Sequence, residues 1–130
     1  MKTLLPPGWP RPKGYSNGIS ASGRAIFTAG VVGWDEQEKF TSNTLPGQFE
    51  QVLKNIVAIL EQDGAAPEHL VRLTCYVTSI EAYLASLAEI GDAWQRIIGR
   101  HYPAMALVEV VRLVEPQAMV EIEAIAVVEE

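Results

Sequence analysis

Two glutamates lie inside an otherwise apolar segment near the C-terminus, and their type and spacing suit chemistry. Glu121 and Glu123 belong to the run Val-Glu-Ile-Glu-Ala-Ile-Ala-Val, residues 120–127. A strand alternates its side chains between two faces, so both carboxylates share one face, and the other face holds Val120, Ile122, Ala124 and Ala126. Burying a carboxylate is costly unless it is paired or hydrogen-bonded. We therefore expect a cleft, a partner chain or a cation at this face, or else simple exposure to solvent.

The other reactive side chains are placed like structural residues. Cys75 lies in a strand-like run, where a small core residue is expected rather than a nucleophile. His69 and His101 have no serine, cysteine or paired carboxylate at motif spacing, which indicates surface or capping roles. There is no phosphate-binding glycine loop, zinc-type Cys/His cluster or serine elbow. We predict neither a metal nor a cofactor.

Length and composition narrow the class of protein. A chain of 130 residues with 48% hydrophobic content fits one domain, residues 1–130. Such a chain buries about two-thirds of the surface that it exposes when unfolded. A net charge of -6 and an isoelectric point near 4.9 argue against nucleic acid as a partner. The apolar run after Lys2 is too short for a signal peptide, and no run could span a bilayer. We expect a cytoplasmic protein with no membrane partner.

The N-terminal third predicts an extended lead-in followed by two strands. Residues 1–14 contain four prolines, which suit an extended segment over the surface with Trp9 as a hydrophobic peg. Residues 16–21 and 25–32 are typical of strands joined by a turn. The segment Gly30-Val31-Val32-Gly33 ends the second of these with two glycines, which would allow close approach of a ligand or a neighbouring strand.

The middle of the chain predicts two amphipathic helices separated by a strand. Thr44 is a plausible N-cap for the first helix, whose apolar residues recur at three- and four-residue spacing up to Gly64. Residues 70–78 alternate between an apolar and a mixed face, as a strand does. Ser79 is a plausible N-cap for the second helix, which Gly99 would end.

The C-terminal residues 103–130 complete the predicted order. Two apolar runs flank Glu115-Pro116-Gln117, which predicts a pair of strands joined by a turn. The expected order is strand, strand, helix, strand, helix, strand, strand. Each helix has one apolar face, so both are expected on one face of a mixed sheet in an α+β fold. The other face of the sheet is also partly apolar, which indicates self-association.

Several segments resemble the RidA family, also called YjgF/YER057c/UK114. The C-terminal pattern PA-x-x-x-VEV-x-x-L followed by VEIEAIAV carries the resemblance most clearly. Upstream matches are Gly14-Tyr15-Ser16, Phe27-Thr28-Ala29-Gly30 and residues 70–78. The resemblance implies a chorismate-mutase-like fold, with two helices on one face of a mixed sheet, assembled as a homotrimer. It also implies ligand clefts between adjacent subunits and hydrolysis of imines and enamines to a keto acid and ammonia.

The resemblance assigns roles to particular residues of the cleft. Tyr15 matches the tyrosine that closes over the ligand, and Gly30 matches a glycine whose backbone faces the cleft. Leu107 occupies the position whose backbone amide helps to hold the ligand. Glu121 matches the glutamate that orients the attacking water. No metal or cofactor belongs to this set.

One position departs from the family pattern. The family's PARS-type motif reads Pro103-Ala104-Met105-Ala106 here, so Met105 stands where an arginine clamps the substrate carboxylate. A guanidinium offers two parallel donors that match a carboxylate, whereas a thioether has neither charge nor donor. Arg112 and Arg100 are the candidates that the sequence offers for a replacement anchor.

Three functions remain open from the sequence. The first is a trimer that hydrolyses a small imine or enamine other than a typical α-imino acid, with Glu121 as general base. The second is a non-catalytic trimer that binds a metabolite or regulates a partner. The third is an endoribonuclease, a label attached to some relatives, which the acidic charge and the lack of a His/Lys/Arg cluster make unattractive.

Overall fold

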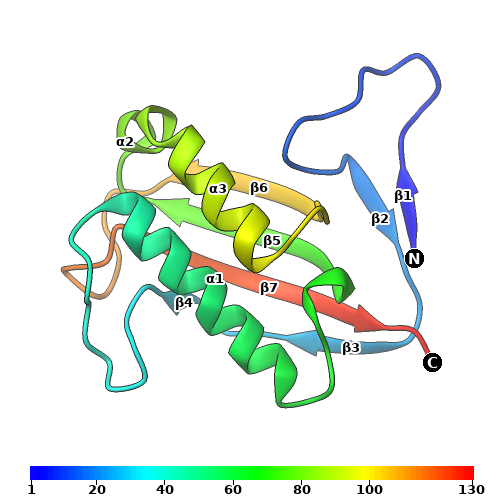
Figure 1. Cartoon of the computed structure of the whole chain (residues 1–130). Coiled ribbons are helices and arrows are strands. Elements are labelled where there is room, and N and C mark those ends of the chain that lie inside the picture. The colour runs from blue at the N-terminus through cyan, green and yellow to red at the C-terminus, as the bar shows by residue number, and fades with distance from the viewer.

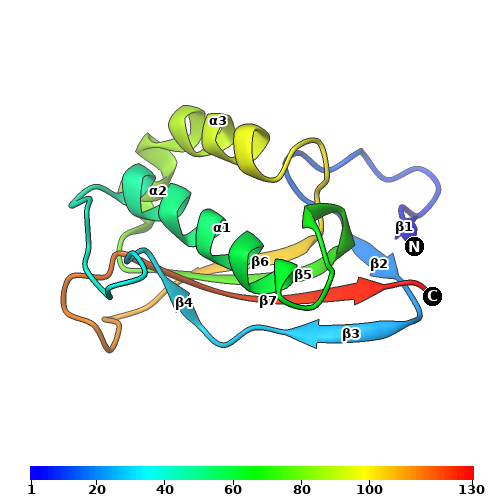
Figure 2. The same cartoon turned by 60° about the horizontal axis from the view of Figure 1, so that its bottom comes forward.

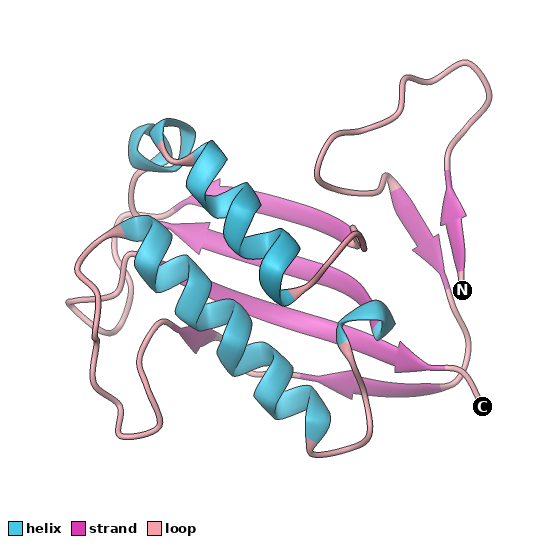
Figure 3. Cartoon of the chain, viewed as in Figure 1, coloured by secondary structure: helices cyan, strands magenta, loops and turns pink.

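A mixed sheet in the order β3–β7–β5–β6, with β4 also paired to β7, forms the centre of the computed structural model, which describes all of residues 1–130 (Figures 1 and 3). β6 runs parallel to β5, and every other pair in this sheet is antiparallel. The strands are β3 Arg24–Phe27, β4 Val31–Val32, β5 Leu70–Val77, β6 Ala104–Glu109 and β7 Val120–Val128. A separate antiparallel ribbon, β1 Lys2–Leu4 and β2 Gly18–Ser20, lies at one end of the sheet.

The helices cover one face of the sheet and leave the other face bare (Figure 2). They are α1 Leu45–Glu61, α2 Ile80–Ala85 and α3 Leu87–Ile97, with a short 3-10 turn at Pro67–His69. Thr44 caps α1 as predicted, since its side chain accepts a hydrogen bond from the Gly47 N–H at 3.2 Å. No helix is long and apolar enough to cross a membrane.

The core lies between α1, α3 and the covered face of the sheet, and it confirms the alternation predicted for β7. The apolar stripe of α1 is buried at all positions but Val57, which is partly buried. The alternate residues of β7 are also buried, namely Val120, Ile122, Ala124 and Ala126. Glu121 and Glu123 therefore lie on the opposite, uncovered face. The α+β class and the placement of the helices on one face agree with the sequence analysis.

The C-terminal strands form, but they are not paired with each other. β5 lies between β6 and β7, and residues 110–119 connect these two outer strands across the end of β5. The predicted first strand also ends early, at Glu109. Beyond it, Val111 and Val114 are 98% and 90% exposed. Apolar composition indicates a strand, but it specifies neither its partner nor its end.

Three further predictions of local structure need correction. The predicted strand over residues 25–32 is interrupted between β3 and β4. Phe27 pairs with Ile125 and Val31 with Ile122, so this segment has one residue more than the facing part of β7, as in a β-bulge. Residues 18–20 pair with β1, inside the predicted lead-in, and not with β3. Trp9 is 58% exposed and does not act as a peg, since its loop extends away from the sheet (Figure 1).

The second predicted helix is divided into α2 and α3 at Ser86. The backbone of Ser86 leaves helical geometry, and its hydroxyl donates to the Ala82 carbonyl at 2.7 Å. Serine side chains that bond back to the preceding turn compete with the helical backbone bonds. The structure therefore has three α-helices where the sequence pattern predicted two.

Gln48 is the one buried polar side chain, and it connects three segments. Its amide nitrogen donates to the Ser42 carbonyl at 3.1 Å and to the Gln117 carbonyl at 2.9 Å. Its amide oxygen accepts from the Met119 N–H at 2.8 Å. The start of α1 is thereby tied both to the preceding loop and to the segment that leads into β7.

Replacing Gln48 by Leu is expected to lower the free energy of unfolding by about 2–4 kcal/mol, because backbone groups at Ser42, Gln117 and Met119 lose buried partners. Urea denaturation measures the change. The matched control is Gln62→Leu at the exposed end of α1, for which a change within about 0.5 kcal/mol is expected. Equal losses in the two variants would contradict this role for Gln48.

Candidate functional site

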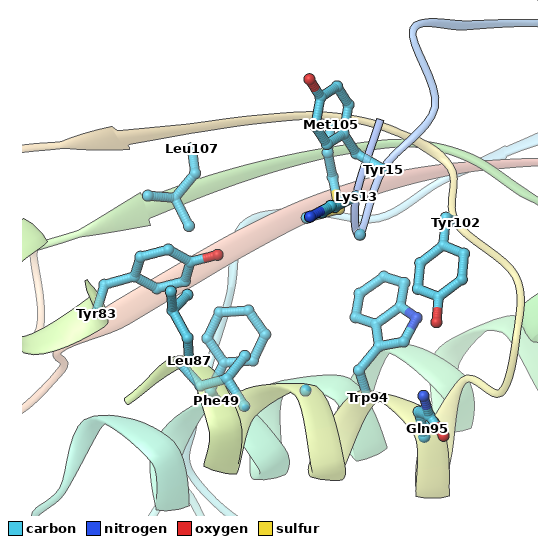
Figure 4. A pocket seen from close by; sticks show the side chains of 13 residues that line it. Lys13, Tyr15, Phe49, Tyr83, Leu87, Trp94, Gln95, Tyr102, Met105 and Leu107 are labelled. Carbon is cyan, nitrogen blue, oxygen red and sulfur yellow. The ribbon is translucent and has the colours of Figure 1, made fainter. Parts of the chain in front are cut away.

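A pocket of about 480 Å³ lies between α3, β6 and the end of the N-terminal lead-in (Figure 4). Nine of its thirteen lining residues are hydrophobic, so it is mainly an apolar cavity. Phe49 of α1 and Tyr83, Leu87 and Trp94 of α2 and α3 line the helical side. Its volume is suited to a small organic molecule.

Aromatic contacts hold the walls of this pocket in place. The rings of Trp94 and Tyr102 stack at 6.2 Å between centroids and 8° between planes. The Trp94 indole N–H donates to the His101 carbonyl at 3.1 Å, so it is not free for a ligand. Phe49 and Tyr83 lie 6.4 Å apart. Burial raises the pKa of the Tyr83 hydroxyl, which stays protonated and can donate a hydrogen bond.

Met105 and Leu107 form the strand side of the pocket. They are in register with Leu73 and Cys75 of β5, whose side chains are buried on the helix-covered face. β6 is the edge strand of the sheet, and both side chains are only half-buried. The predicted site residues Met105 and Leu107 are thus brought to one cavity.

The lead-in is attached to β6 at Ser16, and this attachment places Tyr15 at the pocket. The Ser16 N–H donates to the Pro103 carbonyl at 3.1 Å, and the Ser16 hydroxyl donates to the Tyr102 carbonyl. Gly14 has φ +80°, a left-handed conformation that favours glycine. Tyr15 lies at the rim, 43% exposed, with its hydroxyl directed outward (Figure 4).

Gly30 and Glu121 are also brought together, but away from this pocket. The Glu121 carboxylate lies against Gly30, where the Cβ of any other residue would overlap it. Glu121 is in register with Tyr76 of β5, on the uncovered face. On the same face Glu123 accepts a hydrogen bond from the Tyr76 hydroxyl at 2.8 Å, which raises the pKa of Tyr76.

The predicted site is therefore divided within one chain. Tyr15, Met105 and Leu107 surround the pocket on the helix-covered face, beside the edge strand β6. Gly30 and Glu121 meet on the opposite face, at β7. The two groups belong to opposite faces of one sheet, so a single subunit does not bring Glu121 to the pocket.

Comparison with known proteins decides the family. The sequence profile described as Endoribonuclease L-PSP matches residues 10–128. A RutC family protein from Pyrococcus abyssi is 34% identical over 119 residues, which are 90% of this chain and 89% of that protein. The chain belongs to the RidA family.

Two further RidA-family comparisons bear on the fold and on function. The crystal structure of YyfB from Yersinia pestis, a Rid family protein of unknown function, matches with a TM-score of 0.84 at 30% identity, covering 98% of both chains. A 2-iminobutanoate/2-iminopropanoate deaminase from Salmonella typhimurium is 28% identical over 87% of this chain and 86% of its own. The fold expected from the family resemblance is thus confirmed at the level of α+β architecture.

Ten of the thirteen pocket residues were not among the predicted site residues, and Lys13 is the charged one among these ten. Neither Arg112 nor Arg100, the proposed replacement anchors, lines the cavity. Arg112 lies instead in the connection between β6 and β7, beside Thr78 and Met119. Lys13 precedes the Gly14-Tyr15 motif directly, and that adjacency was the one signal in the sequence that could have identified it.

The histidines and the cysteine have structural partners. His101 Nε2 lies 2.6 Å from the Leu70 carbonyl, and His69 Nδ1 accepts from the Ala66 N–H at 2.9 Å. Cys75 is fully buried, and burial raises the pKa of its thiol to about 12, so it stays protonated. No three histidine, cysteine, aspartate or glutamate side chains are gathered as a metal site.

Replacing Gly30 by Ala is expected to displace the Glu121 carboxylate while leaving the fold intact. The added methyl group meets the end of a flexible side chain, so the free energy of unfolding should change by less than about 1 kcal/mol. A crystal structure of the variant would locate the carboxylate. An unmoved Glu121 would contradict the contact described here.

Proposed function

We propose that this RidA family member hydrolyses a small imine or enamine, other than the typical small α-imino acids, in clefts between the subunits of a homotrimer. The main support for this proposal is that the predicted site residues lie on two opposite faces of the sheet. Glu121 and the Met105 pocket occupy opposite faces of one sheet, so a cleft that uses both needs a second copy of the chain. The imine deaminase among the relatives supports the reaction class.

The uncovered face of the sheet supports self-association. Phe27 of β3 is 70% exposed there, beside Ile125 of β7, with which it pairs. Val108 of β6 shares this face and is 45% exposed. Large apolar side chains on a bare sheet face are typical of a surface that another subunit covers. A trimer, as the family resemblance implies, would cover this face.

The proposed reaction adds water across a C=N bond. Glu121 accepts one proton from the water as the water oxygen attacks the imine carbon, and the imine nitrogen takes up a proton, which gives a neutral carbinolamine. The nitrogen takes up a second proton and leaves as ammonia when the C–N bond breaks, and the carbinolamine hydroxyl loses its proton as the C=O bond of the product forms. The Leu107 backbone amide would support developing negative charge. One water is consumed for each ammonia, and no electrons are exchanged.

Met105 sets the selectivity in this proposal. Its thioether lies among aromatic and aliphatic side chains and provides no charge to a carboxylate. An apolar group of the substrate therefore packs at residue 105. Residue 105 itself therefore does not hold a substrate carboxylate.

The second candidate is a binding or regulatory trimer without catalysis. The observation in its favour is that no aspartate, glutamate or histidine lines the pocket, so one chain places no carboxylate or imidazole base at the cavity. Tight binding of a small molecule without turnover would support this alternative. The endoribonuclease reading has no comparable support, because the pocket contains a single cationic side chain and the chain carries a net charge of -6.

Ammonia release from imines that an amino-acid oxidase generates in situ tests the reaction. The wild type is expected to act faster on the imine of phenylalanine than on that of alanine, and Met105→Arg should reverse this preference. Glu121→Gln should lower the rate by about 100-fold or more, whereas Glu123→Gln on the same strand should retain most of it. Equal rates for wild type and Glu121→Gln would overturn the proposed hydrolysis.

Sedimentation equilibrium tests the assembly. The wild type is expected to have the mass of a trimer, and Phe27→Glu to dissociate it, because an unpaired carboxylate would be buried between subunits. The control Leu84→Glu changes a residue that is 58% exposed on α2, over the helix-covered side, and should remain trimeric. A monomeric wild type would contradict the inter-subunit cleft.

A further inference from the structure

Lys13 is the single charged residue that lines the pocket, and it has no partner in the chain. The other lining residues are apolar, aromatic or neutral polar, and none is a carboxylate. The ion pairs of the structure involve other residues, and no hydrogen bond uses the Lys13 ammonium. An unpaired cation at the mouth of a neutral pocket favours an anionic ligand.

The backbone around Lys13 directs this side chain to the cavity. Ser16 fixes the chain to the start of β6 through its bond to the Pro103 carbonyl at 3.1 Å. The chain bends over residues 13–15 just before this attachment, with Gly14 in the left-handed conformation. Figure 4 shows the Lys13 ammonium pointing into the space between Leu107, Tyr83 and Trp94.

The remainder of the pocket is suited to an apolar body larger than a few atoms. The cavity of about 480 Å³ is lined on its inner side by Phe49, Leu87, Trp94 and Met105. The Trp94 N–H is already bonded to His101, so this wall offers an apolar surface. One cation beside an extended apolar surface matches an amphipathic monoanion.

We propose that Lys13 binds the carboxylate of the ligand, and that the ligand is a monocarboxylic acid with an aromatic or branched aliphatic body. The acid lies at the rim and the body lies inward against Met105 and Trp94. This inference rests on the proposed function only for the reaction that follows binding.

Isothermal titration calorimetry with phenylacetate and phenylacetamide tests the role of Lys13. These probes have the same ring and differ in charge, and neither is a substrate for hydrolysis of a C=N bond. We expect the wild type to bind the acid about tenfold more tightly than the amide. Lys13→Gln should abolish this preference and leave the affinity for the amide unchanged.

Lys39→Gln is the matched control, because it removes the same charge from an exposed lysine outside the pocket. It should keep the preference of the wild type for the acid. A preference that survives Lys13→Gln, or that falls equally in Lys39→Gln, overturns the assignment to Lys13. A wild type that does not distinguish acid from amide, or binds neither, also overturns it.

Gly91→Leu tests where the apolar body lies. Gly91 lines the pocket from α3, and a Cβ added there meets no atom within 4 Å, so the variant should fold. It is expected to weaken the binding of both probes by about tenfold or more, because the added side chain fills the cavity. Unchanged binding would place the body elsewhere and contradict the proposal.

The binding assay and the ammonia assay test the ligand class and the hydrolysis separately. Loss of the acid preference in Lys13→Gln, with no ammonia release by the wild type, supports this ligand class and contradicts the proposed hydrolysis. Ammonia release that depends on Glu121, with binding unaffected by Lys13→Gln, supports the hydrolysis and overturns the ligand class.

Discussion

The alternation of side chains along β7 is the constraint on which the candidate site depends. Val120, Ile122 and the two alanines that follow at every second position are needed in the core against α1. Because side chains alternate along a strand, Glu121 must lie on the face opposite the helices, where it contacts Gly30. The cavity needs the helices as a wall and therefore forms on the covered face. A carboxylate on β7 and a pocket under α3 are for this reason separated by the sheet itself.

The cavity exists because α3 does not fill the space over the edge strand. Gly91 offers no side chain toward it, and Trp94 of α3 stacks on Tyr102 at the wall of the cavity. Atoms that line an empty space lose contacts that a packed interior would provide, so such a pocket is unfavourable for stability. The core beneath α1, centred on Leu53 and Ile56, is by contrast fully buried. The fold is thus tightly packed on one side and open where a ligand would bind.

The parts predicted from the sequence are those with a local or periodic signal. Residue types within a few positions of one another predicted the Thr44 cap, the apolar stripe of α1 and the two faces of β7. The structure confirms all three. The partner of each strand depends on contacts distant in sequence, which is why β6 and β7 were wrongly joined. Ser86 breaks a helix through one side-chain bond that composition does not reveal. In the site, Tyr15 and Met105 were found through motifs, whereas Lys13 belongs to a loop whose course is fixed only by the distant bond of Ser16 to Pro103.

The proposed carboxylate anchor on the lead-in, Lys13, would select ligands differently from an arginine on β6. An arginine holds a carboxylate through two parallel donors, so it fixes the orientation of the acid as well as its charge. A lysine is a point charge on a flexible stem and accepts an acid from several directions. Orientation must then come from the apolar body of the ligand against Trp94 and Met105. Selectivity in such a pocket follows the shape of that body, because one cation at the rim of an acidic protein attracts many monoanions but distinguishes few of them.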